Sequence, residues 1–141
     1  MGSEMCIRDR QRRMPYLPAL RLYQMPVKFH KMTKRTINKK IVSIINQYKK
    51  ELEARGIKVK KILLYGSYAR GKARKDSDID LVVISDDFKN MDLFERHSLL
   101  GRARVNISHP MEILGFTEEE ISRQKKGSFI YDEVLPNSRE F

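Results

Sequence analysis

Hydrophobic residues within residues 36–55 recur at intervals of three, four and seven positions, which is the spacing of one face of an α-helix. The other positions carry mainly lysine and glutamate, and Gly56 follows as the expected end of the helix. The pattern predicts an amphipathic helix whose apolar side packs on a core. Its apolar positions are Ile37, Ile41, Ile44, Ile45, Tyr48 and Leu52.

Three apolar runs, each typical of a strand, occupy residues 57–65, 79–84 and 111–116. The first run ends at Gly66, and Ser67 is expected to cap a short helix there. Combined with the helical patterns around them, these runs predict an α/β (α+β) fold. We expect a small mixed β-sheet flanked by helices.

The second half of the chain contains further helical patterns. Residues 91–104 are amphipathic, and Thr117 with Glu120 forms a capping box for the helix that follows. Ser128 is expected to cap a last helix over residues 129–135. The expected inward positions of the helix at 91–104 are Leu93, Phe94, Leu100 and Ala103.

Two aspartates, Asp78 and Asp80, stand at the start of the second apolar run. Side chains two positions apart share one face of a strand, so both carboxylates project together while Ile79 and Leu81 turn into the core. Neighbouring carboxylates repel unless a cation lies between them, and Mg²⁺ is commonly held by carboxylates together with substrate phosphates. Ser67 follows the first strand, so it meets the aspartates only if the two strands are antiparallel.

Three segments of this region resemble the GS…ARG…SDxDL signature of minimal nucleotidyltransferases of the DNA polymerase β superfamily. They are Gly66-Ser67, Ala69-Arg70-Gly71 and Ser77-Asp78-Ile79-Asp80-Leu81. The resemblance covers residues 33–141 and implies a nucleotidyltransferase fold and dependence on Mg²⁺. It also implies transfer of a nucleoside monophosphate, with AMP as a candidate, from an NTP to a hydroxyl acceptor, with release of pyrophosphate.

The resemblance implies that Asp78 and Asp80 bind metal together with a third acid from a later strand. Glu112 is the one acid within the predicted third strand, at a position where the family more often has aspartate. A carboxylate inside a buried run is costly without a cation, which supports this assignment. The alternative is a glutamate on an edge strand that faces water. Two Mg²⁺ ions, with Mn²⁺ as a substitute, would form the clamp that such a transfer needs.

Gly66 and Ser67 match the turn that binds the triphosphate in this family. Glycine lets the backbone approach the phosphates, and the serine hydroxyl is a donor to a phosphate oxygen. Arg70 and Lys72 border the same turn and are assigned to nucleotide binding as well. Arg70 also fits a structural role within the ARG segment, and Lys72 fits a solvated loop equally well.

Residues 66–73 nearly spell a competing pattern, the P-loop GxxxxGK[ST]. Ala73 stands where that pattern needs a hydroxyl to bind Mg²⁺. The next strand begins within a few residues, which leaves no room for the long helix that follows a P-loop. A P-loop hydrolase is therefore disfavoured.

Lone domains of the resembled family frequently occur beside helical proteins of the HEPN type. An antitoxin-like binding partner of such a toxin, with weak or no catalysis, is therefore the alternative function. A nucleic-acid binder using the basic surface ranks last, because no reader motif is present. Homo-oligomers and hetero-oligomers both stay open.

The chain of 141 residues carries 29 Lys/Arg against 18 Asp/Glu, a formal charge of +11. This excess suits an anionic ligand such as a nucleotide, although a solvated basic surface is equally ordinary. The single cysteine, Cys6, excludes an internal disulfide and favours a cytoplasmic location. No run approaches the roughly 18 apolar residues of a membrane span, so no membrane contact is expected.

Residues 1–32 differ from the rest of the chain. They have no apolar period, are punctuated by Pro15, Pro18 and Pro26, and hold seven Lys/Arg but two acids. The segment MCIRDR also resembles translated adapter sequence from metagenomic reading frames. We expect a non-native or disordered basic leader over residues 1–32 and one domain over residues 33–141.

Overall fold

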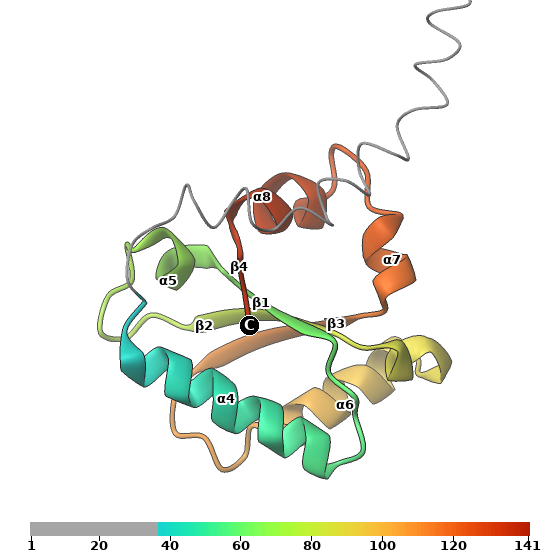
Figure 1. Cartoon of the computed structure of the whole chain (residues 1–141), viewed down its shortest axis with the longest axis horizontal. Helices are drawn as coiled ribbons and strands as arrows, with labels where there is room; N and C mark the ends of the chain where they lie inside the picture. The colour runs from blue at the N-terminus through green and yellow to red at the C-terminus, as the bar shows by residue number, and fades with distance from the viewer. Residues whose placement is uncertain (1–36) are drawn as a thin grey trace, which may run out of the picture.

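Four strands form one mixed sheet in the computed structural model, which describes residues 37–141 (Figure 1). Their order across the sheet is β3-β2-β1-β4. β1 pairs antiparallel with β2 and β4, whereas β2 and β3 are parallel. The antiparallel β1–β2 pair brings the end of β1 to the start of β2, as predicted. The strands are β1 (Lys61–Tyr65), β2 (Ile79–Ile84), β3 (Met111–Phe116) and β4 (Arg139–Glu140).

Helices cover both faces of this sheet, which confirms the predicted α/β architecture (Figure 1). The two longest, α4 (Lys39–Ala54) and α6 (Leu93–Ala103), lie on one face. Every helix within residues 37–141 is too short or too polar to span a lipid bilayer. The shorter elements are α5 (Gly66–Arg70), the 3₁₀ segment η1 (Asp86–Asn90), α7 (Glu118–Ser122), the π-helical turn η2 (Ile130–Val134) and α8 (Leu135–Asn137).

Alternation along the strands builds two hydrophobic layers. Ile62 and Leu64 of β1 pack into the layer formed with α4 and α6, whereas Leu63 and Tyr65 pack into the layer formed with α7 and η2. The predicted inward face of α4 is confirmed. Its buried side chains are Ile41, Ile45, Tyr48 and Leu52, with Ile37 and Ile44 packed at the margin.

Tyr48 joins α4 to α6 through a buried hydrogen bond. Its hydroxyl donates to the carbonyl oxygen of Leu100 at 3.0 Å. Burial raises the pKa of Tyr48, so the hydroxyl keeps its proton and remains a donor at any physiological pH. The two main helices of this face are thereby held in a fixed relation to each other.

Helix starts follow the capping residues. α4 begins at Lys39, later than predicted, because the Asn38 side chain accepts a hydrogen bond from the Lys40 amide at 2.9 Å and caps the helix there. The predicted capping box of Thr117 and Glu120 is confirmed at α7. The predicted leader, residues 1–32, and the predicted domain start at residue 33 lie outside the described residues.

The prediction that Leu93 and Phe94 point inward is wrong, because they are 71% and 78% exposed. Leu93 lies on the same helix face as buried Leu100, but the first turn of α6 borders an open cavity instead of the core. Leu100 and Ala103 are buried, as predicted.

The first strand and the C-terminal segment also differ from expectation. β1 begins at Lys61, although Ile57 ahead of it is buried. The predicted last helix is divided into η2 and α8, and Ser128 caps this segment by accepting the Tyr131 amide at 3.2 Å. β4 was not predicted, since two residues are too few to show a strand pattern.

The outer edge of β3 is bonded to side chains of the preceding helical segment. Arg96 of α6 donates to the carbonyl oxygen of Gly115 at 3.3 Å, and Arg104, the residue after α6, donates to that of Met111 at 2.7 Å. Arg96 also forms a bidentate ion pair with Glu120 of α7, at 2.7 and 2.8 Å. These bonds connect the layers on the two faces around the edge of the sheet.

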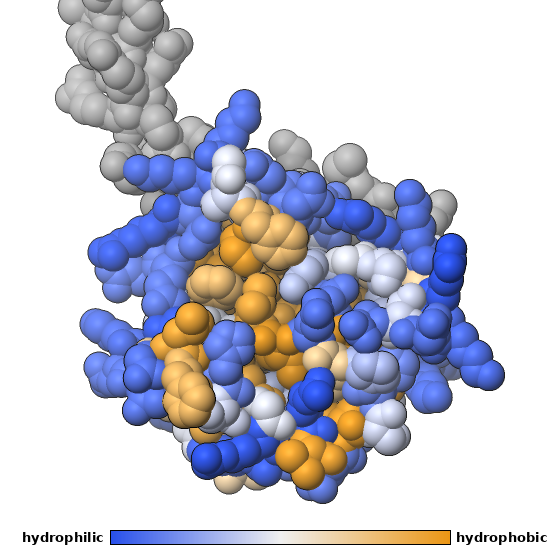
Figure 2. Space-filling model, turned by 180° about the vertical axis from the view of Figure 1, so that it is seen from behind, coloured by the Kyte–Doolittle hydropathy of each residue, from blue (hydrophilic) through white to orange (hydrophobic). Residues whose placement is uncertain are grey.

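Hydrophobic side chains remain visible on the surface seen from behind the view of Figure 1. Figure 2 shows them gathered in the middle of that face with polar side chains around them. Among residues 37–141, the large hydrophobic side chains with the greatest exposure are Leu93, Phe94, Val105 and Phe129. Burial of apolar surface is therefore incomplete within residues 37–141.

We expect Gly115→Ala to destabilise the fold by about 1–3 kcal/mol, as overpacking of a core does. A Cβ at this position would lie 3.0 Å from Cδ1 of Leu100 and 3.2 Å from Cε2 of Phe88, and both of these side chains are buried. The matched control is Gly101→Ala in α6, where a Cβ meets nothing within 4 Å. It should stabilise the helix by up to about 1 kcal/mol. Urea unfolding measures both changes, and equal stability of the two variants would contradict this account of the β3–α6 packing.

Candidate active site

Three side chains form a row across the end of the sheet. The register pairs Tyr65, the last residue of β1, with Asp80 of β2, and pairs Asp80 with Glu112 of β3. Asp80, Val82 and Ile84 alternate with the residues that face α4 and α6, so Asp80 projects on the α7 side of the sheet. Glu112 projects on that side as well. Sheet pairing therefore brings together a tyrosine and two carboxylates from three strands.

The structure places the predicted carboxylates beside one another with unequal burial. Asp80 is half-buried, whereas Asp78 and Glu112 are exposed, and Ile79 is buried as predicted. Met111 and Ile113 are buried as predicted, whereas the expectation that the Glu112 carboxylate is buried between them is wrong. Glu112 lies on β3, an edge strand, and its side chain reaches solvent. Glu112 lies beside Asp80 because the register of the β2–β3 pair places these two residues opposite each other.

The electrostatic environment of Asp80 disfavours its charged form. Folding raises the pKa of this carboxyl from 3.8 to about 6, because burial removes water and the Glu112 charge repels a second negative charge. A hydrogen bond with the Glu112 carboxyl and the charge of Asp78 act in the same direction. The three acids are thus close enough to influence one another.

Tyr65 was not predicted as part of the site. Burial raises its pKa to about 12, with further contributions from the charges of Asp80 and Glu112. Its ring packs edge-on against Phe129, with centroids 5.8 Å apart and planes at 75°. No motif marks this tyrosine, since only the pairing of β1 with β2 shows that it lies next to the carboxylates.

Gly66 leaves the space that Asp80 occupies. Its φ of 72° lies in the left-handed region, and a Cβ there would overlap the carboxylate oxygen Oδ2 of Asp80. The backbone at the end of β1 therefore passes directly against the carboxylate. Only glycine can adopt this left-handed backbone conformation and also leave room for the Asp80 carboxylate.

Ser67 lies inside α5 and does not cap it, so the prediction of an N-cap is wrong. The helix starts at Gly66, its N-cap residue is Tyr65, and no side chain makes a cap hydrogen bond. The hydroxyl of Ser67, half-buried, is therefore not used to begin the helix. The backbone carbonyl oxygen of Ser67 accepts a hydrogen bond from the Lys72 amide at 2.9 Å, which closes the end of α5.

The two basic residues assigned to nucleotide binding have different surroundings. Arg70 forms an ion pair with Glu133 of η2 at 2.6 Å, so it connects α5 to the opposite segment. Lys72 is exposed beyond the end of α5. The helix has five residues and lies between antiparallel strands, which excludes the P-loop arrangement of a long helix between parallel strands.

The donor set suits a hard divalent cation. Within residues 37–141, no three acidic, histidine or cysteine side chains converge closely enough to form a ready-made metal site. Asp80 and Glu112 nevertheless form a carboxylate pair, with Asp78 nearby, and no basic residue of the described part of the chain lowers the pKa of Asp80. Mg²⁺ is usually held by one or two carboxylates and completed by substrate phosphates and water, so the residues fit such an ion.

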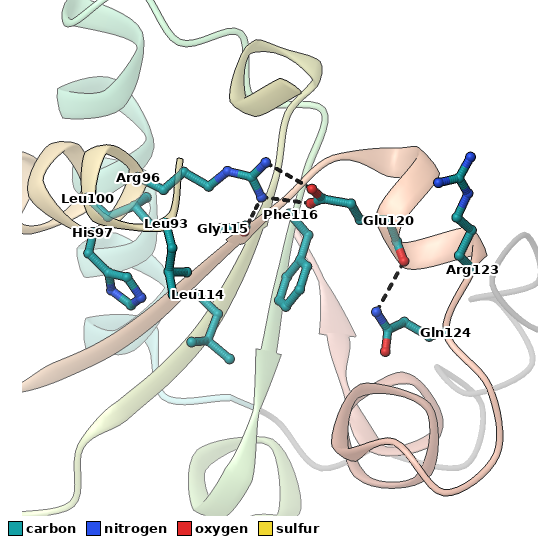
Figure 3. Close-up of a pocket in the computed structure, with 10 residues that line it drawn as sticks. All are labelled: Leu93, Arg96, His97, Leu100, Leu114, Gly115, Phe116, Glu120, Arg123 and Gln124. Carbon is teal, nitrogen blue, oxygen red and sulfur yellow. Dashed lines mark hydrogen bonds and ion pairs between the residues drawn. The ribbon is translucent and has the colours of Figure 1, made fainter. Parts of the chain in front are cut away.

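A cavity of about 320 Å³ lies elsewhere, at the other end of β3 (Figure 3). Arg96 and Glu120, bonded to each other, both line it, and Phe116 belongs to its lining as well. Phe116 is four residues beyond Glu112, or roughly 13 Å along a strand. This cavity is therefore separate from the carboxylate row.

Comparison with known proteins gives a match to a family model described as "Nucleotidyltransferase domain", over residues 45–136. Protein adenylyltransferase MntA of Thermococcus cleftensis is 41% identical over 51 residues, which are 36% of this chain and 50% of that protein. The chain spans about half the length of the curated relatives it matches. A solved structure titled "Crystal structure of the toxin-antitoxin with AMP-PNP" aligns with a TM-score of 0.49 at 22% identity, over 67% of this chain and 69% of that one.

We expect Asp80→Asn to raise the melting temperature at pH 8 but not at pH 4, measured in EDTA. Because folding raises the pKa of Asp80 to about 6, the folded protein holds this proton more tightly than the unfolded chain does. That contribution to stability is present at low pH and is lost as the pH rises through about 6. Asparagine has no proton to lose in this range, so the variant does not lose stability as the pH rises. Asp76→Asn, on the exposed loop before β2, is the control; a pH-independent effect of Asp80→Asn would contradict the assignment.

We expect Gly66→Ala to abolish the rise in melting temperature that Mg²⁺ with ATP gives the native chain, because the new methyl group displaces Asp80. Gly56→Ala is the matched control, since Gly56 also has a left-handed φ, of 85°, but open space around it. Both variants should lose about 1–2 kcal/mol from backbone strain. Only Gly66→Ala should lose the response to ligand. A normal response in this variant would show that the backbone contact with Asp80 has no role in binding.

Proposed function

The chain belongs to the nucleotidyltransferase domain family, and we propose that it transfers a nucleoside monophosphate from an NTP to a hydroxyl acceptor with release of pyrophosphate. One observation carries the proposal: register places Glu112 beside Asp80, with Gly66 against the same carboxylate. The parts needed to hold a triphosphate and its metal are thus adjacent.

Asp80 and Glu112 would hold one divalent cation between them, with Asp78 completing a second position. Bound there, Mg²⁺ or Mn²⁺ would neutralise phosphate charge and activate the acceptor hydroxyl. The proximity of the two carboxylates favours this, because a cation relieves the repulsion that raises the pKa of Asp80. Tyr65 is the neighbour of Asp80 on β1.

Gly66 and Ser67 would bind the triphosphate. The first amides of α5 have no partner within the helix, and the absence of a Cβ at Gly66 lets a phosphate approach the backbone. The Ser67 hydroxyl, which does not cap the helix, is a further donor. Arg70 keeps α5 in place through Glu133, and Lys72 is the nearby cation available to the terminal phosphates.

The names of the curated relatives favour AMP as the transferred group and a protein hydroxyl as the acceptor. These are proposals for this chain, which matches about half of each relative. A binding role without catalysis would not require Gly66 to leave space for a carboxylate. The alternative of an antitoxin-like partner without activity is therefore less favoured, although a partner protein can also be the acceptor.

We expect label from α-labelled ATP to become covalently attached to an acceptor, and label from γ-labelled ATP to leave as pyrophosphate. The assay combines the full chain, Mg²⁺ and a panel of Ser, Thr and Tyr acceptors that includes helical proteins. Glu112→Gln should remove at least 99% of transfer, since it loses metal-dependent stabilisation of about 2.7–4 kcal/mol. Lys72→Ala should leave modest transfer, because the metals would carry most of the transition-state charge.

The products distinguish this proposal from hydrolysis at the γ-phosphorus. Release of orthophosphate, with Lys72 indispensable and Glu112 dispensable, would show that the proposal is wrong. Loss of activity in both variants would instead assign Lys72 to the transition state as well.

A further inference from the structure

The loop before β3 holds both residues that flank Asp78. His109 Nε2 lies 3.2 Å from the carbonyl oxygen of Ser77, and the Ile79 amide donates to the carbonyl oxygen of Pro110 at 2.9 Å. The Asp78 side chain itself makes no hydrogen bond or ion pair with residues 37–141. Its position therefore depends on the backbone on either side, and that backbone is bonded to residues 109 and 110.

The partner of His109 determines its tautomer. A carbonyl oxygen can only accept, so Nε2 must carry the proton that is donated to Ser77. The same nitrogen lies 3.4 Å from the Tyr68 hydroxyl, and the two rings pack edge-on with centroids 6.0 Å apart. Tyr68 follows Ser67 in α5, so the imidazole also touches the helix that begins at the phosphate turn.

One imidazole thus joins three segments of the candidate site. Tyr68 belongs to the helix of Gly66 and Ser67, Ser77 precedes Asp78, and His109 itself lies three residues before Glu112. Scattered histidines give no metal-ligand spacing in the sequence, so nothing in the sequence marks this role. Residues that orient a metal ligand through hydrogen bonds change metal affinity by about 10–100-fold when they are replaced.

We propose that His109 is a positioning residue that holds Asp78 toward the Asp80–Glu112 pair through its hydrogen bond to Ser77. The inference rests on the proposed function, because it assigns Asp78 to the metal. His109 touches neither metal nor substrate. Its loss should weaken metal binding and leave the binding of NTP without metal unchanged.

The test measures Mn²⁺ affinity in the presence of ATP, from the electron paramagnetic resonance signal of free Mn²⁺. We expect His109→Leu to weaken Mn²⁺ binding by about 10–100-fold. His109→Gln should keep near-native affinity, because its amide N–H reaches the position of Nε2. His109→Asn carries the same amide on a shorter side chain and should behave like leucine. His97→Leu, on the exposed face of α6, is the control and should have no effect.

Two further measurements separate positioning from general stability. Melting temperatures must show that each variant is folded at the assay temperature, and ATP affinity in EDTA should be the same in all of them. If His109→Leu does not fold, the difference in Mn²⁺ affinity between His109→Gln and His109→Asn tests the inference. Equal Mn²⁺ affinity of these two variants would overturn the inference while leaving the proposed function intact. A native chain that binds no Mn²⁺ with ATP would overturn both.

Discussion

Two carboxyl groups, those of Asp80 and Glu112, are held side by side although they repel each other whenever both are ionised. The parallel pairing of β2 with β3 fixes this contact, and the hydrophobic layers on both faces fix the sheet. Folding of the core therefore supplies the free energy that keeps like charges close. The cost at Asp80 is small in comparison with the burial of β2, whose other side chains are all buried.

The sequence predicts the elements of this fold well where local pattern decides them. The period of α4, the capping box at Thr117 and the apolar run of β2 each follow from residues within a few positions. The signature around Gly66 and Asp80 also predicts where chemistry is concentrated, because close backbone approach and paired carboxylates need particular residue types at fixed spacing.

Features that depend on contacts between distant segments could not be predicted in this way. The resemblance predicts that Glu112 lies beside Asp80. The physical reason is the register of β2 with β3, which cannot be read from local sequence patterns. Tyr65 joins the row for the same reason. Phe94 is exposed because α6 presents another face to the sheet, and His109 gains its role from a carbonyl 32 residues earlier.

The arginine contacts at the outer edge of β3 affect how this chain meets other chains. An edge strand with free carbonyl groups is a template on which an extended segment of another molecule can add. Here Arg96 and Arg104 already donate to the carbonyl oxygens of Gly115 and Met111. Another molecule approaching this edge would have to displace charged donors before a ladder could grow. Addition of a strand at this edge of the sheet is therefore disfavoured.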